Sequence, residues 1–130
     1  MADHSHPVDP ERVQEAQARG LTASEASAMA ALLTLLADPL RARIICALLV
    51  TDEMCVGDLA LALDATEDAV SYGLRLLRTA GLVHRRREGR LGYYRLNDGE
   101  ARDAIQAALA QLCTLVGLHP ETTADDNEEG

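Results

Sequence analysis

The stretch that decides the fold runs from Thr66 to Gly81 and reads Thr-Glu-Asp-Ala-Val-Ser-Tyr-Gly-Leu-Arg-Leu-Leu-Arg-Thr-Ala-Gly. Thr66 is a residue type that caps a helix N-terminus, and the two acids after it complement the positive end of the helix dipole. Gly81 suits the left-handed residue that follows a helix C-terminus. The spacing therefore predicts one compact helix of about four turns.

The two faces of this helix differ in chemistry. Small and aliphatic side chains share the face that we expect to be buried, namely Ala69, Val70, Gly73, Leu74 and Leu77. Hydrogen-bonding and cationic side chains share the outward face, namely Asp68, Ser71, Tyr72, Arg75 and Arg78. A short apolar helix over residues 54–63 and a tight turn precede this segment, and an Arg-rich hairpin follows it. This order predicts the recognition helix of a winged helix-turn-helix.

The flanking segments complete a mainly α fold with a small β-hairpin wing. Two strands, residues 82–87 and 91–96, are predicted on either side of the turn Glu88-Gly89-Arg90. Helices are predicted over residues 11–19, 22–36, 39–50 and 97–118, with cap pairs Thr22/Glu25 and Asn97/Glu100. The predicted organisation is a flexible N-terminal arm (1–8), a DNA-binding and dimerisation domain (9–118) and an acidic disordered tail (119–130).

Composition favours one helical core that dimerises. The chain has 130 residues, of which 48% are apolar and 2% aromatic, so its core must be built from small aliphatic side chains. Such a core buries little area per residue, and a homodimer would supply the missing burial. The apolar helix near the C-terminus is the expected dimer seam, and Cys46 is expected to be a small buried hydrophobe.

The charge distribution favours nucleic acid despite a net charge of -9. All 12 basic residues are Arg, and seven of them lie between positions 71 and 95: Arg75, Arg78, Arg85, Arg86, Arg87, Arg90 and Arg95. Glu88 is the only acid in that window, whereas five acids follow position 119. Three cysteines without a secretory signal predict a cytoplasmic protein without disulfides or membrane spans. No catalytic spacing occurs, so we expect no enzyme.

Together these motifs resemble the metal-responsive ArsR/SmtB family of bacterial repressors, over about residues 30–115. The resemblance rests on Leu-Ala-Asp-Pro-Leu-Arg (36–41), Glu-Met-Cys-Val-Gly-Asp-Leu (53–59), Ala-Val-Ser (69–71), Leu-Arg-Thr-Ala-Gly-Leu-Val (77–83) and Gly-Arg-x-x-x-Tyr-x-Leu (89–96). It implies a homodimer that places two recognition helices in successive major grooves of double-stranded operator DNA. It also implies release from the operator when an inducer binds.

The expected DNA contacts fall into two groups. Ser71, Tyr72 and Arg75 are candidates for base contacts, because Arg to guanine is the commonest bidentate contact in the major groove. Arg78 at the helix end, with Arg87 and Arg90 of the wing, are candidates for phosphates or the minor groove. Relatives often carry His where this chain has Tyr72 and Gly73, so the operator sequence does not transfer.

The resemblance places a first metal site at the start of the 54–63 helix. Cys55 and Asp58 match its helix positions, and His4 and His6 are candidates from the arm of the partner subunit. One thiolate, one carboxylate and two imidazoles make a four-coordinate set that favours Zn²⁺ as inducer, with Co²⁺, Cd²⁺ or Ni²⁺ as alternatives.

Other sites and functions stay open. Asp98 and Glu100 match part of a second family site, but its later positions hold Gln111 and Thr114, which are poor ligands. Cys113 with His119 resembles the tail ligands of soft-metal sensors, and Ala2-Asp3-His4 can bind Ni²⁺ or Cu²⁺ if Met1 is removed. A repressor that senses oxidation through Cys55 or Cys113 is one alternative function. A winged-helix module that binds another protein is the other.

Overall fold

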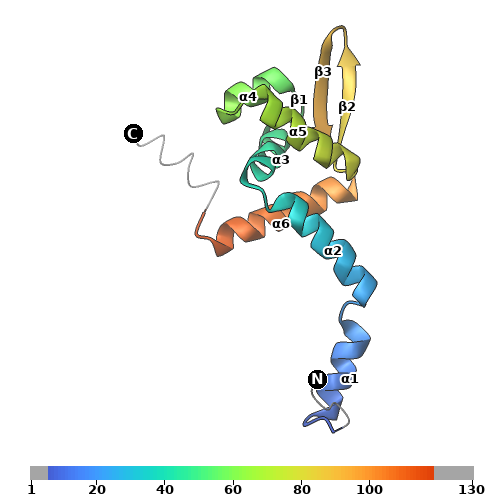
Figure 1. Ribbon diagram of the computed structural model, residues 1–130. Coiled ribbons are helices and arrows are strands. Elements are labelled where there is room, and N and C mark those ends of the chain that lie inside the picture. Colours follow the sequence, from blue (N-terminus) through green and yellow to red (C-terminus); the bar gives the residue numbers. More distant parts are fainter. Residues whose placement is uncertain (1–5, 119–130) are drawn as a thin grey trace. The chain divides into compact units, whose positions relative to one another are not determined.

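The computed structural model describes residues 6–118, shown as a ribbon in Figure 1. In chain order the elements are α1 (Pro10–Arg19), α2 (Ala23–Leu36), α3 (Pro39–Thr51), β1 (Met54–Cys55), α4 (Val56–Leu63), α5 (Glu67–Thr79), β2 (Val83–Glu88), β3 (Leu91–Leu96) and α6 (Glu100–Leu115). The chain divides into two compact units between Ala37 and Asp38. The single domain over 9–118 stays a prediction, and positions 1–5 and 119–130 lie outside the described residues.

The first unit consists of α1 and α2, and both helices begin with a side-chain cap, of which the sequence predicts the pair Thr22/Glu25. The Asp9 carboxylate accepts a hydrogen bond from the Arg12 backbone N–H at 3.1 Å. Thr22 and Glu25 form a full capping box, with reciprocal hydrogen bonds of 3.1 and 2.9 Å. Neither helix contains a buried residue, and most of the apolar side chains of α2 are exposed.

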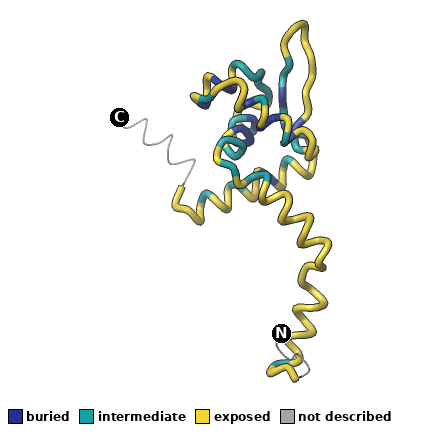
Figure 2. The backbone as a smooth tube through the Cα atoms, viewed as in Figure 1, coloured by how far each residue is buried: buried dark blue, intermediate teal, exposed yellow. Residues whose placement is uncertain are grey.

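The second unit has its core where α3, α4 and α5 pack against the sheet, as the buried segments in Figure 2 show. The fully buried side chains are aliphatic, namely Ile44, Ile45, Leu48, Leu59, Val70, Leu74, Leu77, Val83 and Leu96. Four of the five residues predicted for the inner face of α5 are buried, but Ala69 is exposed. Ala69 lies about 100° around the helix axis from Val70, which puts it beyond the edge of the packed face.

The sheet has three antiparallel strands in the order β1-β3-β2, one more than the predicted hairpin. Met54 and Cys55 were expected to begin a helix, but they pair as β1 with Tyr94 and Tyr93 of β3. A two-residue strand carries no period of its own, so only the pairing with β3 defines it. Cys55 consequently stands at the junction of sheet and helix, as the N-terminal cap residue of α4.

The start of α6 differs from the predicted cap. Gly99, at φ 97°, is the N-terminal cap residue, and no side chain caps the helix. Asn97 instead donates a side-chain hydrogen bond to the carbonyl oxygen of Gly81, which joins the two ends of the hairpin. The helix ends at Leu115, three residues before the predicted end, and it buries only Ile105.

Candidate nucleic-acid interface

Helix α5 presents the outward face that its sequence predicts. The Thr66 hydroxyl accepts a hydrogen bond from the Ala69 N–H at 3.1 Å, which fixes where the helix begins. Ser71 is half-buried, Tyr72 is 54% exposed, and Arg75 and Arg78 are exposed. The Arg75 guanidinium carbon lies 6.0 Å from the centroid of the Tyr72 ring, at the outer limit of a cation–π contact. The side chains of Tyr72 and Arg75 are therefore neighbours on this face.

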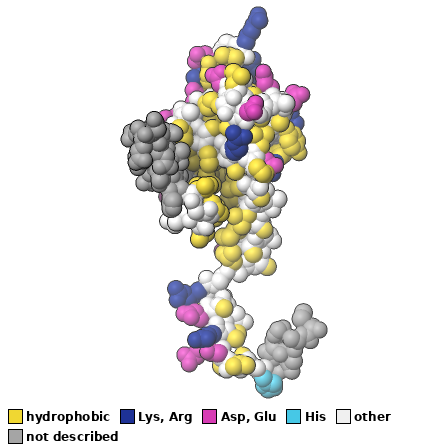
Figure 3. Space-filling view, turned by 90° about the vertical axis from the view of Figure 1, so that its left-hand side faces the viewer, with side chains coloured by type: hydrophobic (Ala, Val, Ile, Leu, Met, Phe, Trp, Pro, Cys, Tyr) yellow, Lys and Arg dark blue, Asp and Glu magenta, His cyan; other side chains and the backbone are white. Residues whose placement is uncertain are grey.

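The wing directs its arginines to two opposite faces. Strands β2 and β3 pair in register from Val83 with Leu96 to Glu88 with Leu91, and Gly89 (φ 62°) and Arg90 make the two-residue turn. Because side chains alternate along a strand, Arg85 and Arg87 share one face and Arg86 lies on the other. The space-filling view shows basic side chains at the wing end of the molecule (Figure 3).

Arg85 and Arg87 face a groove between α5 and the wing, with a volume of about 540 Å³. We call it the wing groove. It is lined by Cys55, Val56, Gly57, Glu67, Ser71, Arg85, Arg87, Arg90, Leu91, Gly92 and Tyr94. Three of the predicted DNA contacts, Ser71, Arg87 and Arg90, are thus brought together. Tyr72, Arg75 and Arg78 do not line the groove.

Arg85 is a candidate contact that the sequence did not single out. Its position two residues before Arg87 was the available indication, because residues two apart share a face of a strand. Gly92 makes room for it: a Cβ atom at Gly92 would lie 3.1 Å from the Arg85 Cδ. The Arg85 side chain can therefore lie across β3 and reach the wing groove.

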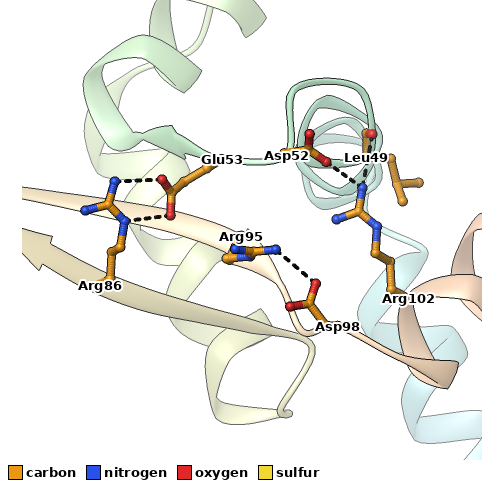
Figure 4. A network of polar contacts seen from close by, with 7 residues as sticks. All are labelled: Leu49, Asp52, Glu53, Arg86, Arg95, Asp98 and Arg102. Carbon is orange, nitrogen blue, oxygen red and sulfur yellow. Dashed lines mark hydrogen bonds and ion pairs between the residues drawn. The ribbon is translucent and has the colours of Figure 1, made fainter.

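Arg86, on the opposite face of the wing, is held by protein groups (Figure 4). Its guanidinium donates two hydrogen bonds to the Glu53 carboxylate, at 2.8 and 2.9 Å, and one to Glu88 at 2.7 Å. It also lies 4.7 Å from the centroid of the Tyr93 ring. The hydrogen bonds from Arg86 lower the pKa of the Glu53 carboxyl, and the same contacts raise the pKa of Arg86. Arg86 therefore orients the wing and does not contribute to the wing groove.

Two further ion pairs hold α6 and the hairpin. Arg102 of α6 donates to the Asp52 carboxylate at 2.9 Å and to the Leu49 carbonyl oxygen at 3.4 Å, which joins α6 to the end of α3 (Figure 4). Arg95 pairs with Asp98 at 3.0 Å. Asp98 is thus the partner of an arginine and not a helix cap.

The predicted metal ligands are only partly described. Cys55 is half-buried, whereas Asp58, His6, Asp98 and Glu100 are exposed. His4 and His119 lie outside the described residues. Among residues 6–118, no three or more His, Cys, Asp or Glu side chains are grouped as a metal site requires. Within residues 6–118 of one chain, Cys55 and Asp58 are therefore not joined by the further ligands of a four-coordinate set.

Cys46 of α3 and Cys113 of α6 interact electrostatically. Cys46 was expected in the core, but it is exposed, because it lies on the side of α3 away from Ile44 and Ile45. Enough atoms nevertheless surround its sulfur that burial raises the pKa of the Cys46 thiol, and the nearby Cys113 thiol raises this pKa further. Cys113 is half-buried on α6. The thiol that interacts with Cys113 is therefore that of Cys46 on α3.

Comparison with known proteins agrees with this architecture. The family model of the bacterial regulatory proteins of the arsR family matches residues 38–85. A transcriptional repressor SmtB homologue of Synechocystis is 44% identical over 102 residues, which cover 78% of this chain and 76% of that protein. The chain belongs to the ArsR family. ArsR-family proteins are DNA-binding transcriptional regulators and not enzymes. The predicted resemblance to this family and the prediction that the protein is not an enzyme are therefore confirmed.

Solved ArsR-family structures confirm the winged helix-turn-helix fold. Reduced HlyU from Vibrio cholerae is 36% identical with a TM-score of 0.59, and the match covers 68% of this chain and 93% of that one. The antimony-specific repressor AntR is 28% identical with a TM-score of 0.63, covering 83% of this chain and 95% of that one. In the described part of this ArsR-family chain, no helix has the length and apolar character needed to cross a membrane.

Tyr72 and Gly73 of this ArsR-family chain occupy different environments on α5. Gly73 is buried, and a Cβ atom there would lie 3.1 Å from Ile44 Cδ1 and 3.4 Å from Arg41 Cγ. Gly73 therefore allows α5 to approach α3 closely. Only Tyr72 of the pair is on the exposed face of α5.

Proposed function

We propose that the protein is a homodimeric repressor that binds operator DNA through α5 and the wing. The observation that carries this proposal is the wing groove, where Arg85, Arg87 and Arg90 face the same space as Ser71 of α5. Cations of this kind bind phosphates, and the exposed Tyr72 and Arg75 can reach base edges when a helix enters a major groove. The -9 net charge does not oppose this, because Arg75 and Arg78 of α5 lie near Arg85, Arg87 and Arg90 in the chain and these five belong to α5 and the groove face of the wing.

The proposed dimer seam is on α6. Leu112, Leu115 and Val116 are 52%, 81% and 70% exposed, so a single chain leaves an apolar stripe in water. Stripes of this kind mark interaction surfaces, and a two-fold symmetric contact would bury both copies at once. Dimerisation would also set two α5 helices at the spacing of successive major grooves.

The proposed inducer is a divalent metal ion, with Zn²⁺ favoured. Cys55 and Asp58 would supply a thiolate and a carboxylate from α4, and His4 and His6 of the partner's arm would supply imidazoles. The support is that Cys55 lines the wing groove, so an arm tethered there would lie beside the DNA-contacting side chains. The similarity to AntR, an antimony-specific repressor, adds support for an inorganic inducer of this general kind.

Oxidation of Cys46 and Cys113 is the second candidate. The observation that favours it is that the Cys113 thiol, after burial, raises the pKa of the Cys46 thiol, so that Cys113, one of the two cysteines that the sequence offered, has a second thiol in its neighbourhood. Peroxide would convert the Cys113 thiolate to a sulfenic acid, because the raised pKa of Cys46 disfavours its thiolate, and the Cys46 thiol would displace water to form a disulfide. The two thiols lose two electrons and two protons, and the peroxide is reduced to water. Because α6 is also the proposed seam, a bond there would strain the dimer.

One experiment separates these candidates. Operator duplexes are selected from a random pool, and binding is followed by fluorescence anisotropy with Zn²⁺, with peroxide and with a chelator. If the metal acts at Cys55, Cys55→Ser abolishes release by Zn²⁺ and keeps release by peroxide. If the thiol pair acts, Cys46→Ser and Cys113→Ser abolish release by peroxide and keep release by Zn²⁺. A wild-type protein without salt-dependent DNA binding would refute the repressor and favour a protein-binding module.

A further inference from the structure

The wing groove contains one acid among its arginines. Glu67 is exposed and lines the same groove as Arg85, Arg87 and Arg90. Within residues 6–118, the ion pairs do not include Glu67, although three cations face the same space. On the other face of the wing, Glu53 is fully engaged by Arg86. A carboxylate left unpaired beside phosphate-binding arginines weakens DNA binding, unless the DNA itself gives it a hydrogen bond.

The helix does not need Glu67 as a cap. Thr66 supplies the side-chain cap of α5, through its hydrogen bond to the Ala69 N–H. Asp68, the next residue, places a second carboxylate in the first turn and interacts equally with the helix dipole. Glu67 differs from Asp68 because it faces the wing groove, one turn before Ser71. Its side chain is thus at the end of α5 that approaches base edges when a recognition helix enters the major groove.

The chemistry of the groove selects one base. An ionised carboxylate only accepts hydrogen bonds, and the major groove offers amino donors on cytosine and adenine. On adenine the amino group lies beside the N7 acceptor of the same base, which repels a carboxylate, whereas on cytosine the N4 amino group lies beside the C5–H group of the same base. We infer that Glu67 is a specificity-determining residue that accepts a hydrogen bond from a cytosine N4 amino group while the wing arginines hold the adjoining phosphates. This inference rests on the proposed operator binding, and it identifies the base that Glu67 would recognise.

The test compares Glu67→Gln with the matched control Asp68→Asn, which removes the same charge one residue away. Duplexes selected by the wild-type protein are changed one base pair at a time, and affinities are measured at fixed salt. The wild type should prefer cytosine at one position of each half-site by roughly 5- to 150-fold. Glu67→Gln should lose that preference and shift toward adenine, which glutamine contacts through N6 and N7. Asp68→Asn should keep the cytosine preference.

Two results would overturn the inference. If Glu67→Gln raises affinity equally for every duplex and keeps the preferred bases, Glu67 acts only as a repelling charge. If the wild type binds no duplex in a salt-dependent way, the proposed operator binding is wrong as well. The first result thus refutes only the role of Glu67, and the second refutes operator binding itself. Far-UV circular dichroism of both variants checks that α5 still forms.

Discussion

The salt dependence of DNA binding gives the most direct test of the wing groove. Replacing Arg87 or Arg90 with Ala should remove one phosphate contact from each subunit of the proposed dimer. Each lost contact lowers the slope of log K against log salt by about 0.9, so two lost contacts lower it by about 1.8. Between about 50 and 200 mM salt, the wild-type affinity should therefore fall roughly 12-fold further than that of the variant. The loss should be similar for all duplexes, because phosphates carry no sequence information.

The matched control is the double variant Arg86→Gln with Glu53→Gln. It removes an arginine from the same strand without changing the net charge, because Arg86 is paired with Glu53 on the face away from the groove. Its salt slope should equal that of the wild type in the same anisotropy titration. If the control changes the slope as much as Arg87→Ala does, the division of the wing into two faces is wrong. Equal slopes for all the proteins would show that the wing does not contact DNA.

Three further predictions concern the thiols, the wing and the seam. Cys113→Ser should shift the pH midpoint of Cys46 alkylation downward, because burial is the larger cause of the raised pKa of Cys46 and this change removes the second cause. Mass spectrometry would follow the modification, and an unchanged midpoint would contradict the interaction. Arg86 lowers the pKa of Glu53, so this pair stabilises the folded protein at any pH above the ordinary pKa of glutamate. That stabilisation is lost as the pH falls through the lowered pKa of Glu53. Melting temperatures measured down to acidic pH should therefore fall less steeply for Glu53→Gln, and parallel curves would count against the pair. Leu112→Glu should produce monomers or aggregates in sedimentation, whereas a stable wild-type monomer at micromolar concentration would refute the seam.

The sequence alone determined the elements that depend on neighbouring residues. Thr66 and Gly81 bound α5 as predicted, and the capping box of α2 is present. Periodicity also identified the inner face of α5, apart from Ala69, and the two strands of the wing. These features rest on capping, backbone freedom and side-chain period, all of which act over a few residues. The metal ligands and the individual DNA contacts remain predictions, because each requires a partner that a single chain does not contain.

Tertiary structure decided which side chains are available. Seven arginines look alike in the sequence, yet Arg86 is engaged by Glu53, 33 residues away, while Arg85 reaches the wing groove across Gly92. The strand at Met54 and Cys55 exists only because β3 lies beside it. Cys46 was predicted to lie in the core, but packing leaves it exposed and near Cys113. Apart from the contact of Arg85 with Gly92 inside the hairpin, the partner is distant in the chain in each case. Local propensity carries no information about such a partner, and the packing of α3, α6 and the sheet sets the contact.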